Sequence, residues 1–320
     1  MKNFKPILIV AGEPNSIFVE ILIKSIKKTK INSPIILIMS LKVFKLQMKK
    51  LNFTYPFKII NENNIILDKI DNKNLNIIDI NYNTKNAFEK ISSKSNYYIK
   101  NCFRLALKLI NRGLTEKFIN GPVSKKYFLK KKYLGITEYL VKKTNSKDYA
   151  MIIYNKELSV TPITTHLPIK LITKNISKKI IIKKINLVKN FFQKKLNINP
   201  KIAIVGINPH CESVDSFDED KKIIKPAVTF LKKKMNIEGP VAADTIFLKS
   251  NRKKYNLIIG IYHDQVLTPI KTLFEYKAIN ITAGLPFIRV SPDHGPNEKM
   301  MGKNKSNPQS LIESLKFLDF

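Results

Sequence analysis

The stretch PILIVAGEPNSIFVEILIKSIKKTKINSPIILIMSLKVFKLQMKK, residues 6–50, decides the class of fold. Two short apolar runs, 6–11 and 34–39, have the length and the β-branched content of buried strands. Each run is followed by a longer segment in which apolar residues recur at helical spacing, 16–28 and 41–50. Alternation of short strands with longer helices is typical of βαβ units, so we predict an α/β fold with a mainly parallel sheet.

The same alternation continues along the rest of the chain. It predicts a long helix over 87–111 that ends near Gly113, and two further helices over 177–194 and 221–234. It also predicts strands over 117–120, 149–154, 201–207 and 257–262. Because a single core stops growing near about 250–300 residues, a chain of 320 residues favours two domains. We find no apolar run long enough to span a membrane and expect no membrane partner.

The formal net charge of +33 raises the question of nucleic-acid binding. Arginine, which base-reading proteins use for its bidentate fork, occurs at only four positions, and the remaining positive charge is lysine spread over the chain. We therefore expect no specific nucleic-acid partner, although the positive field would attract an anionic substrate. Cys102 and Cys211 are too few and too far apart for a disulfide framework, which fits a reducing cytoplasm.

All four histidines, His166, His210, His263 and His294, stand in turn-like segments just after predicted strands. Ligands bind at the carboxyl ends of strands in open α/β sheets, and imidazole is the commonest side-chain metal ligand. A catalytic metal takes three protein ligands and keeps one position open. Each histidine alone is more often structural, but together they predict a metal site. Cys211 is either a further soft ligand beside His210 or a small filler residue.

Acidic residues accompany the histidines: Asp244, Asp264 beside His263, and Asp293 beside His294. Such carboxylates orient metal-binding imidazoles or act as general bases, and at least one is expected to be only a capping or turn residue. Adjacent side chains on an extended segment point to opposite sides, so His263 and Asp264 would need a turn to act together. Neither a G-x-G-x-x-G fingerprint nor a phosphate-binding P-loop occurs, which argues against a standard Rossmann site.

Seven motifs, taken in order along the chain, resemble those of the 4-hydroxythreonine-4-phosphate dehydrogenase family. They are GEP at 12–14, GPV at 121–123, TTHLP at 164–168, NPH at 208–210, GPVAADTIF at 239–247, YHDQ at 262–265 and NITAGLPFIRVSPDHG at 280–295. The resemblance implies a homodimer with two α/β/α domains of the isocitrate/isopropylmalate dehydrogenase type. One domain would comprise 1–125 with about 265–320 and hold both termini. The other, about 126–264, would hold central strands and dimer contacts.

The resemblance also implies the reaction and the residues that perform it. The reaction is the NAD(P)-dependent oxidation of 4-phosphooxy-L-threonine to a 2-amino-3-oxo acid phosphate. That product would decarboxylate to 3-amino-2-oxopropyl phosphate, on the route to pyridoxal 5'-phosphate. A divalent metal, zinc, magnesium or cobalt, would be held by His166, His210 and His263, with the site completed across the dimer interface. The residues implied to bind substrate are Thr137, Lys271, Asn280 and Arg289. Those implied in catalysis are Asp244, Asp264 and Lys271, and those implied to bind the cofactor are Gly12, Glu13, Asp293, His294 and Gly295.

Three departures from the family pattern leave alternatives open. Ile136 stands where the family has a substrate-contacting histidine, and it can neither donate nor accept a hydrogen bond. The segment 212–218 replaces a glycine-rich loop, and 15–18 is bulkier than its family counterpart. One alternative is a related dehydrogenase of another four-carbon phosphorylated acid, such as threonate or erythronate 4-phosphate. A second is a non-catalytic protein that binds metal or phosphate.

Overall fold

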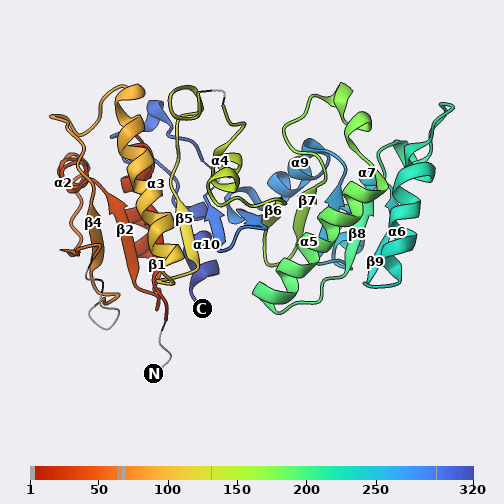
Figure 1. The fold of residues 1–320 in the computed structure, drawn as a ribbon, viewed down its shortest axis with the longest axis horizontal. Coiled ribbons are helices and arrows are strands. Elements are labelled where there is room, and N and C mark those ends of the chain that lie inside the picture. Colours follow the sequence, from red (N-terminus) through yellow and green to blue (C-terminus); the bar gives the residue numbers. More distant parts are fainter. Residues whose placement is uncertain (1–3, 64, 66–69, 131, 293) are drawn as a thin grey trace. The chain divides into compact units, whose positions relative to one another are not determined.

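The computed structural model describes residues 4–63, 65, 70–130, 132–292 and 294–320. The chain divides into two compact units, Met1–Lys143 with Pro286–Phe320, called the first unit here, and Thr144–Leu285, called the second unit. Each unit is an open sheet of mostly parallel strands with helices packed on it (Figure 1). The predicted α/β fold is thus confirmed. Within the described ranges, no helix has the length and apolar character needed to cross a membrane.

Parallel strands alone make up the described sheet of the first unit, in the order β3-β4-β2-β1-β5-β12. Its strands are β1 (Ile7–Val10), β2 (Ile35–Met39), β3 (Phe57–Ile59), β4 (Leu75–Asp79), β5 (Lys117–Asn120) and β12 (Ile288–Ser291). Its helices are α1 (Phe18–Lys28), α2 (Leu41–Lys50), α3 (Asn96–Asn111), α4 (Ile136–Lys143) and α10 (Gln309–Leu318). Helix α3 runs across β1 and β2 (Figure 1), while α1 contacts α2 and α10.

Local sequence explains where these elements begin and end. The Ser40 hydroxyl accepts a hydrogen bond from the Val43 N–H and so caps the start of α2. The predicted helix over 87–111 begins only at Asn96, so its first part was wrong. Segment 87–92 is irregular, and within it the Glu89 N–H donates to the Asn15 side-chain oxygen instead of joining a helix. The end near Gly113 is confirmed, because this glycine has a φ of +80°.

In the second unit the strand order is β11-β6-β7-β10-β8-β9, with antiparallel pairing of β11 with β6 and of β6 with β7, and parallel pairing beyond. The strands are β6 (Ala150–Tyr154), β7 (Ser159–Pro162), β8 (Ile202–Val205), β9 (Ile237–Val241), β10 (Leu257–Gly260) and β11 (Ile279–Ala283). The helices are α5 (Lys178–Leu196), α6 (Lys225–Lys232), α7 (Ala243–Ile246), α8 (Lys249–Arg252) and α9 (His263–Phe274).

The parallel strands β7, β10 and β8 end at one edge of the second sheet. Gly260 of β10 is paired with Pro162 of β7, and Ile259 is paired with Ile204 of β8. The loops after these three strands therefore leave the sheet side by side. A buried apolar cluster that includes Val160, Ile258 and Val266 packs α9 against the strands and holds this edge in place.

Candidate functional site

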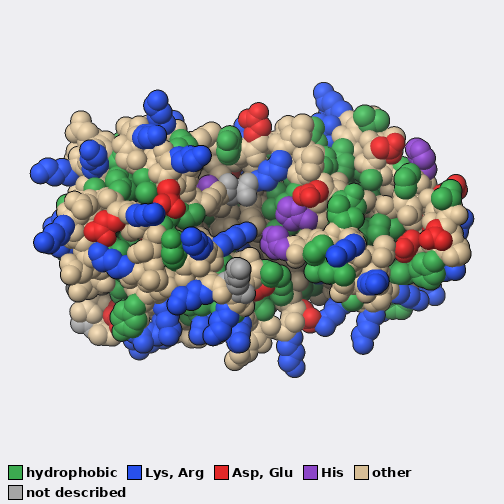
Figure 2. All heavy atoms as spheres, turned by 90° about the horizontal axis from the view of Figure 1, so that it is seen from above, with side chains coloured by type: hydrophobic (Ala, Val, Ile, Leu, Met, Phe, Trp, Pro, Cys, Tyr) green, Lys and Arg blue, Asp and Glu red, His purple; other side chains and the backbone are tan. Residues whose placement is uncertain are grey.

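Two of the predicted metal-binding side chains lie together at this strand edge. The ring centroids of His166 and His263 are 5.6 Å apart. Backbone bonding that continues past the strands brings the two loops together: the Thr164 N–H donates to the Ile261 carbonyl at 3.0 Å, and the Thr164 hydroxyl donates to the same oxygen at 2.8 Å. Figure 2 shows histidine side chains exposed on this face of the molecule beside an acidic side chain. Two imidazoles this close can serve one cation.

His263 is the first residue of α9, and this position allows its side chain to contact that of Asp264. The chain turns into the helix here, so the two adjacent side chains meet, with Nδ1 of His263 at 2.7 Å from Oδ1 of Asp264. An ionised carboxylate can only accept, so Nδ1 carries the proton. The lone pair on Nε2 then remains available for a ligand, as in metal sites where a carboxylate orients the imidazole.

His210 is placed differently from this pair. It lies in a short 3-10 turn, Pro209–Cys211, after β8, and its side chain is exposed. Both His210 and Cys211 have positive φ values, 53° and 65°, which residues other than glycine rarely adopt. In the part of the chain that the structure describes, no three His, Cys, Asp or Glu side chains form a group that could hold a metal ion. Among these described residues, the imidazole pair of His166 and His263 therefore has no third side chain of these types grouped with it, and His210 of the same chain does not complete it.

Asp244 and Cys211 belong to the surroundings of the His210 turn. Asp244 lies exposed in the first turn of α7. Burial raises the pKa of the Cys211 thiol, and the carboxylates of Asp220, Asp244 and Asp218 raise it further. The thiol is therefore held neutral, as expected of a filler residue more than of a thiolate ligand.

In the first unit, two predicted substrate contacts bond to each other. The guanidinium of Arg289 donates through Nη1 to the Thr137 hydroxyl at 2.9 Å and through Nε to the Asn120 side-chain oxygen at 2.8 Å. Arg289 is only 1% exposed, and burial lowers the pKa of its guanidinium to about 10, so it stays charged at neutral pH. Sequence analysis missed Asn120. Its position as a polar residue ending a buried strand, next to Gly121, could have revealed it.

The other predicted substrate contacts belong to the second unit. Asn280 is on β11, and its side-chain oxygen is buried without a hydrogen-bond partner among the described residues. Such an orphaned acceptor is costly unless a ligand or water supplies a donor. Lys271 lies in the last turn of α9, and burial lowers the pKa of its ammonium group. Asp293, predicted to contact the cofactor, lies outside the described residues.

Close backbone packing explains the glycines of two motifs in the first unit. Gly12 has a φ of +78°, and an added Cβ would lie 2.2 Å from the Pro122 carbonyl oxygen. An added Cβ at Gly121 would lie 2.1 Å from the Ala11 carbonyl oxygen. The Glu13 N–H also donates to the Pro122 carbonyl at 2.8 Å. The loops after the neighbouring strands β1 and β5 therefore touch backbone to backbone, which leaves room only for glycine.

The predicted cofactor-contacting residues of the first unit are brought near one another. The Ile17 N–H donates to the Pro296 carbonyl, which joins the loop of Gly12 and Glu13 to the segment with His294 and Gly295. The Glu13 carboxylate is buried, and it accepts hydrogen bonds from the Asn15 backbone and from the Ser95 hydroxyl. Burial raises the pKa of Glu13 and lowers that of His294. The buried carboxylate of Glu13 thus stabilises the conformation of its own loop.

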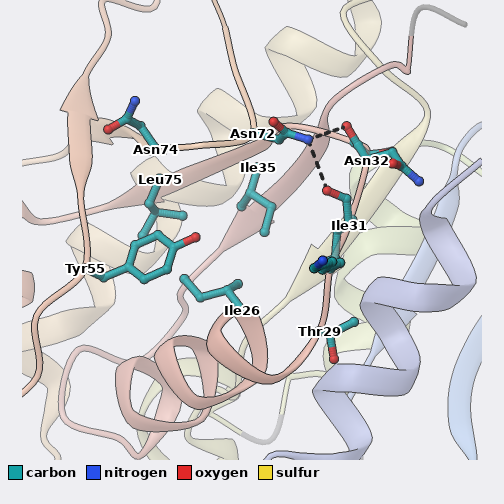
Figure 3. Close-up of a pocket in the computed structure, with 11 residues that line it drawn as sticks. Ile26, Thr29, Ile31, Asn32, Ile35, Tyr55, Asn72, Asn74 and Leu75 are labelled. Carbon is teal, nitrogen blue, oxygen red and sulfur yellow. Dashed lines mark hydrogen bonds between the residues drawn. The ribbon is translucent and has the colours of Figure 1, made fainter.

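A separate cavity of about 350 Å³ lies in the first unit, at the amino ends of β2 and β4 (Figure 3). The ring of Tyr55 faces the side chains of Ile26 and Leu75 across it, and the Asn72 amide donates to the Ile31 carbonyl. No residue predicted for catalysis or binding lines this cavity. Because ligands of open α/β sheets bind at the carboxyl ends of strands, we place the candidate site at the opposite edge.

Imidazoles and carboxylates that follow parallel strands, together with the cationic side chains of Arg289 on β12 and Lys271 on α9, are typical of an active site in an α/β enzyme. The sequence profile of the family described as pyridoxal phosphate biosynthetic protein PdxA matches residues 30–318, and the chain belongs to this family. The resemblance inferred from the seven motifs is therefore confirmed, and so is the expectation that the protein is a dehydrogenase.

Individual relatives cover nearly the whole chain. A protein of Sulfurihydrogenibium sp. named 4-hydroxythreonine-4-phosphate dehydrogenase is 35% identical over 96% of this chain and 95% of its own length. A D-threonate 4-phosphate dehydrogenase of Salmonella typhimurium is 30% identical over 98% of this chain and 97% of its own length. The solved structure of a 4-hydroxythreonine-4-phosphate dehydrogenase from Klebsiella pneumoniae is similar with a TM-score of 0.86 at 27% identity, covering 99% of this chain and 97% of that one.

Proposed function

We propose that the protein oxidises 4-phosphooxy-L-threonine with NAD(P) in the biosynthesis of pyridoxal 5'-phosphate. The observation that carries this proposal is the pair of imidazoles, His166 and His263, with Asp264 bonded to one of them at the carboxyl edge of parallel strands. Family membership and the relative that bears the name of this activity support it. We further propose that the enzyme acts as a homodimer in the cytoplasm, where Cys102 and Cys211 remain free thiols.

The oxidation needs a group that removes a proton from the substrate hydroxyl while the carbon gives its hydride to the nicotinamide. Asp264 is bonded to His263 and so is engaged in orienting that ring. Asp244 is exposed in the first turn of α7 and is left as the candidate base. The 3-oxo acid that results carries its carboxylate β to the ketone, and it loses carbon dioxide to give the amino-ketone phosphate.

We propose that His166, His210 and His263 would hold a divalent cation in the homodimer, with the site completed across the dimer interface, because the imidazole pair of one chain has no third ligand grouped with it among the described residues. When bound, the cation would supply Lewis-acid stabilisation of negative charge on the substrate oxygen. The protein's own contribution is orientation: the Asp264 carboxylate fixes the proton on Nδ1 of His263 and directs Nε2 toward the ligand.

For the phosphorylated substrate we propose recognition by Thr137 and Arg289, with Lys271 and Asn280 as further contacts. Because the Thr137 hydroxyl already accepts from Arg289, its own proton is free to point at an anionic oxygen. Thr137 is partly exposed whereas Arg289 is buried, so the hydroxyl hydrogen of Thr137, which carries a partial positive charge, is the part of this pair that would contact the ligand. We propose Gly12, Glu13, Asp293, His294 and Gly295 as the surroundings of the dinucleotide.

One observation favours a second candidate, oxidation of D-threonate 4-phosphate. Ile136 is the first residue of α4, directly before Thr137, and its side chain offers no hydrogen bond. A relative of 30% identity carries the name of this activity. The two substrates differ at C2, where threonate has a hydroxyl group in place of the amino group.

A coupled assay separates these proposals. Purified protein is mixed with NAD or NADP, with zinc, magnesium or cobalt ions, and with each substrate in turn, and formation of reduced nicotinamide is followed by absorbance. We expect turnover with 4-phosphooxy-L-threonine, its loss after dialysis against a chelator, and its return when metal is restored. The His210→Ala variant should lose both metal and turnover. Turnover with the threonate alone would support the second candidate, and no reduction with either substrate would contradict both.

A further inference from the structure

One buried imidazole nitrogen of the first unit has no hydrogen-bond partner among the described residues. It is Nε2 of His294, which lies three residues after the end of β12. The neighbouring parallel strands β5 and β1 end at the same edge of the sheet. A buried acceptor without a donor is costly, and a bound ligand can supply the missing donor. This nitrogen is therefore a candidate contact for a ligand at the strand edge.

The other nitrogen of the ring decides what Nε2 can bind. Nδ1 of His294 lies 3.0 Å from the Gly295 carbonyl oxygen. A carbonyl oxygen can only accept, so Nδ1 carries the proton of the neutral ring. Burial lowers the pKa of His294, which favours the neutral ring near neutral pH. Nε2 then offers only a lone pair, which can accept from a hydroxyl or amino group and is repelled by an anionic oxygen.

Open space lies beside this ring. An added Cβ at Gly295 would meet no described atom within 4 Å outside its chain neighbours, whereas an added Cβ at Gly12 or Gly121 would meet backbone at 2.2 Å or 2.1 Å. Gly295 is exposed. The Ile17 N–H donates to the Pro296 carbonyl at 3.2 Å and so holds this segment beside the start of α1. A ligand can therefore lie against the Gly295 backbone, next to the imidazole.

We propose that His294 is a specificity-determining residue whose Nε2 accepts a hydrogen bond from a hydroxyl or amino group of NAD. This inference rests on the proposed function, in which His294 and Gly295 belong to the surroundings of the dinucleotide. NAD and NADP differ at the 2' position of the adenosine ribose, where NAD has a hydroxyl donor and NADP has an anionic phosphate. An acceptor that faced this position would favour NAD.

The test measures NADH binding to the full-length chain by nicotinamide fluorescence in the wild type, His294→Asn and His294→Gln. The asparagine side chain can donate to the Gly295 carbonyl but has no atom in the place of Nε2, whereas the longer glutamine side chain can place its oxygen there. We expect His294→Asn to bind NADH about 2-fold to 13-fold more weakly, which is the effect of one hydrogen bond. We expect His294→Gln to bind it nearly as the wild type does.

Two further variants serve as controls. His294→Phe keeps an aromatic ring and lacks both nitrogens, so it tests the same loss should the asparagine variant fail to fold. Gln309→Asn shortens a side chain that donates to Glu313 on α10 of the same unit, and it should bind NADH like the wild type.

Competing ligands identify the half of NAD that supplies the donor. AMP and nicotinamide mononucleotide are each used to displace NADH, and the half whose affinity falls in His294→Asn carries the donor. NADPH is measured directly. If the donor is the 2' hydroxyl, NADPH will bind the wild type more weakly than NADH does, and His294→Asn will weaken it no further.

Two results would overturn the inference. One is a His294→Asn variant that binds NADH like the wild type, and the other is an equal loss in the asparagine and glutamine variants, which would show that only packing of the ring matters. A wild type that binds neither NADH nor NADPH would overturn it as well. The coupled assay on the same preparations separates the two proposals: NAD reduction by the wild type, with NADH binding unchanged in His294→Asn, leaves the dehydrogenase proposal in place.

Discussion

Two carboxylates that lie shortly after strand ends, Asp264 in the first turn of α9 and Glu13 in the loop after β1, show that one functional group takes different roles in different surroundings. The Asp264 side chain is 78% exposed and bonds to an imidazole beside it, so it can orient a ligand-binding ring. Glu13 is 1% exposed, and its carboxylate oxygens accept hydrogen bonds from its own loop and from Ser95. The sequence places both acids next to motif residues, but only burial distinguishes the one that orients a ring from the one that supports a loop.

Replacement of Glu13 by glutamine should change how stability depends on pH. Burial raises the pKa of Glu13 above its ordinary value of 4.5. Its contribution is therefore fully present below pH 4.5 and is lost as the pH rises through the raised value in the folded state. We expect the melting temperature of the wild type, relative to Glu13→Gln, to fall as the pH increases across this interval. The exposed Glu157→Gln serves as control, and a difference independent of pH would contradict the expectation.

The close contact at Gly12 predicts a loss of stability that exceeds the effect of backbone conformation alone. Gly12 and Gly113 have nearly equal φ values, 78° and 80°, but an added Cβ meets the Pro122 carbonyl only at Gly12. In urea unfolding, Gly113→Ala should cost about 1–2 kcal/mol for the left-handed conformation. Gly12→Ala should cost about 1–3 kcal/mol more for the overlap. Equal losses would show that the two loops can move apart.

At the scale of elements, periodicity predicted the regular segments well and their edges less well. Helix α2 and strand β5 were predicted at their observed bounds. The strand predicted over 257–262 ends at Gly260, because α9 starts directly at His263. Strands such as β9 and β12 were not predicted, since they are short and lie in segments whose turn and motif residues dominate the pattern. The meeting of His166 with His263 depends on strand pairing, which local periodicity does not encode.

The start of α4 is the element where substrate choice can be tested. Ile136→His would place a hydrogen-bonding ring directly before Thr137. One added polar contact contributes about 0.5–3 kcal/mol, the larger value for contacts to charge, and so raises kcat/KM by about 2-fold to 150-fold. We expect this gain with 4-phosphooxy-L-threonine and compare it with D-threonate 4-phosphate in the coupled assay. Ile136→Leu is the control, and an unchanged ratio of the two substrates would exclude a role for this position.

At the scale of the molecule, the order of the strands in each sheet could not be predicted from the sequence. The strand order of the first sheet is β3-β4-β2-β1-β5-β12, so the strand at one edge comes from the end of the chain. No local sequence pattern predicts that β12 pairs with β5. The class of fold, in contrast, follows from alternation alone, because any set of βαβ units must bury its strands between helices. The cationic composition is likewise visible in the sequence, and Figure 2 shows Lys and Arg side chains scattered over the face in view.

This scattered charge predicts weak binding to DNA without sequence preference. Contacts between lysine and phosphate release counterions, so the affinity should fall steeply as the salt concentration rises. We expect equal retardation of unrelated duplexes in a gel-shift assay at low salt and none at physiological salt. A duplex that binds selectively would contradict the view that the lysines reflect composition and would point to a dedicated surface.

The enclosure of Arg289 gives the molecule an internal reporter. Arg104, Arg112 and Arg252 are at least partly open to solvent, whereas the fourth arginine is sealed beneath Thr137 and Asn120. A dicarbonyl reagent that modifies guanidinium groups should therefore label three sites quickly and the fourth only when β12 and α4 part. The rate at which Arg289 is modified, followed by mass spectrometry of peptides, would measure how often β12 and α4 separate locally.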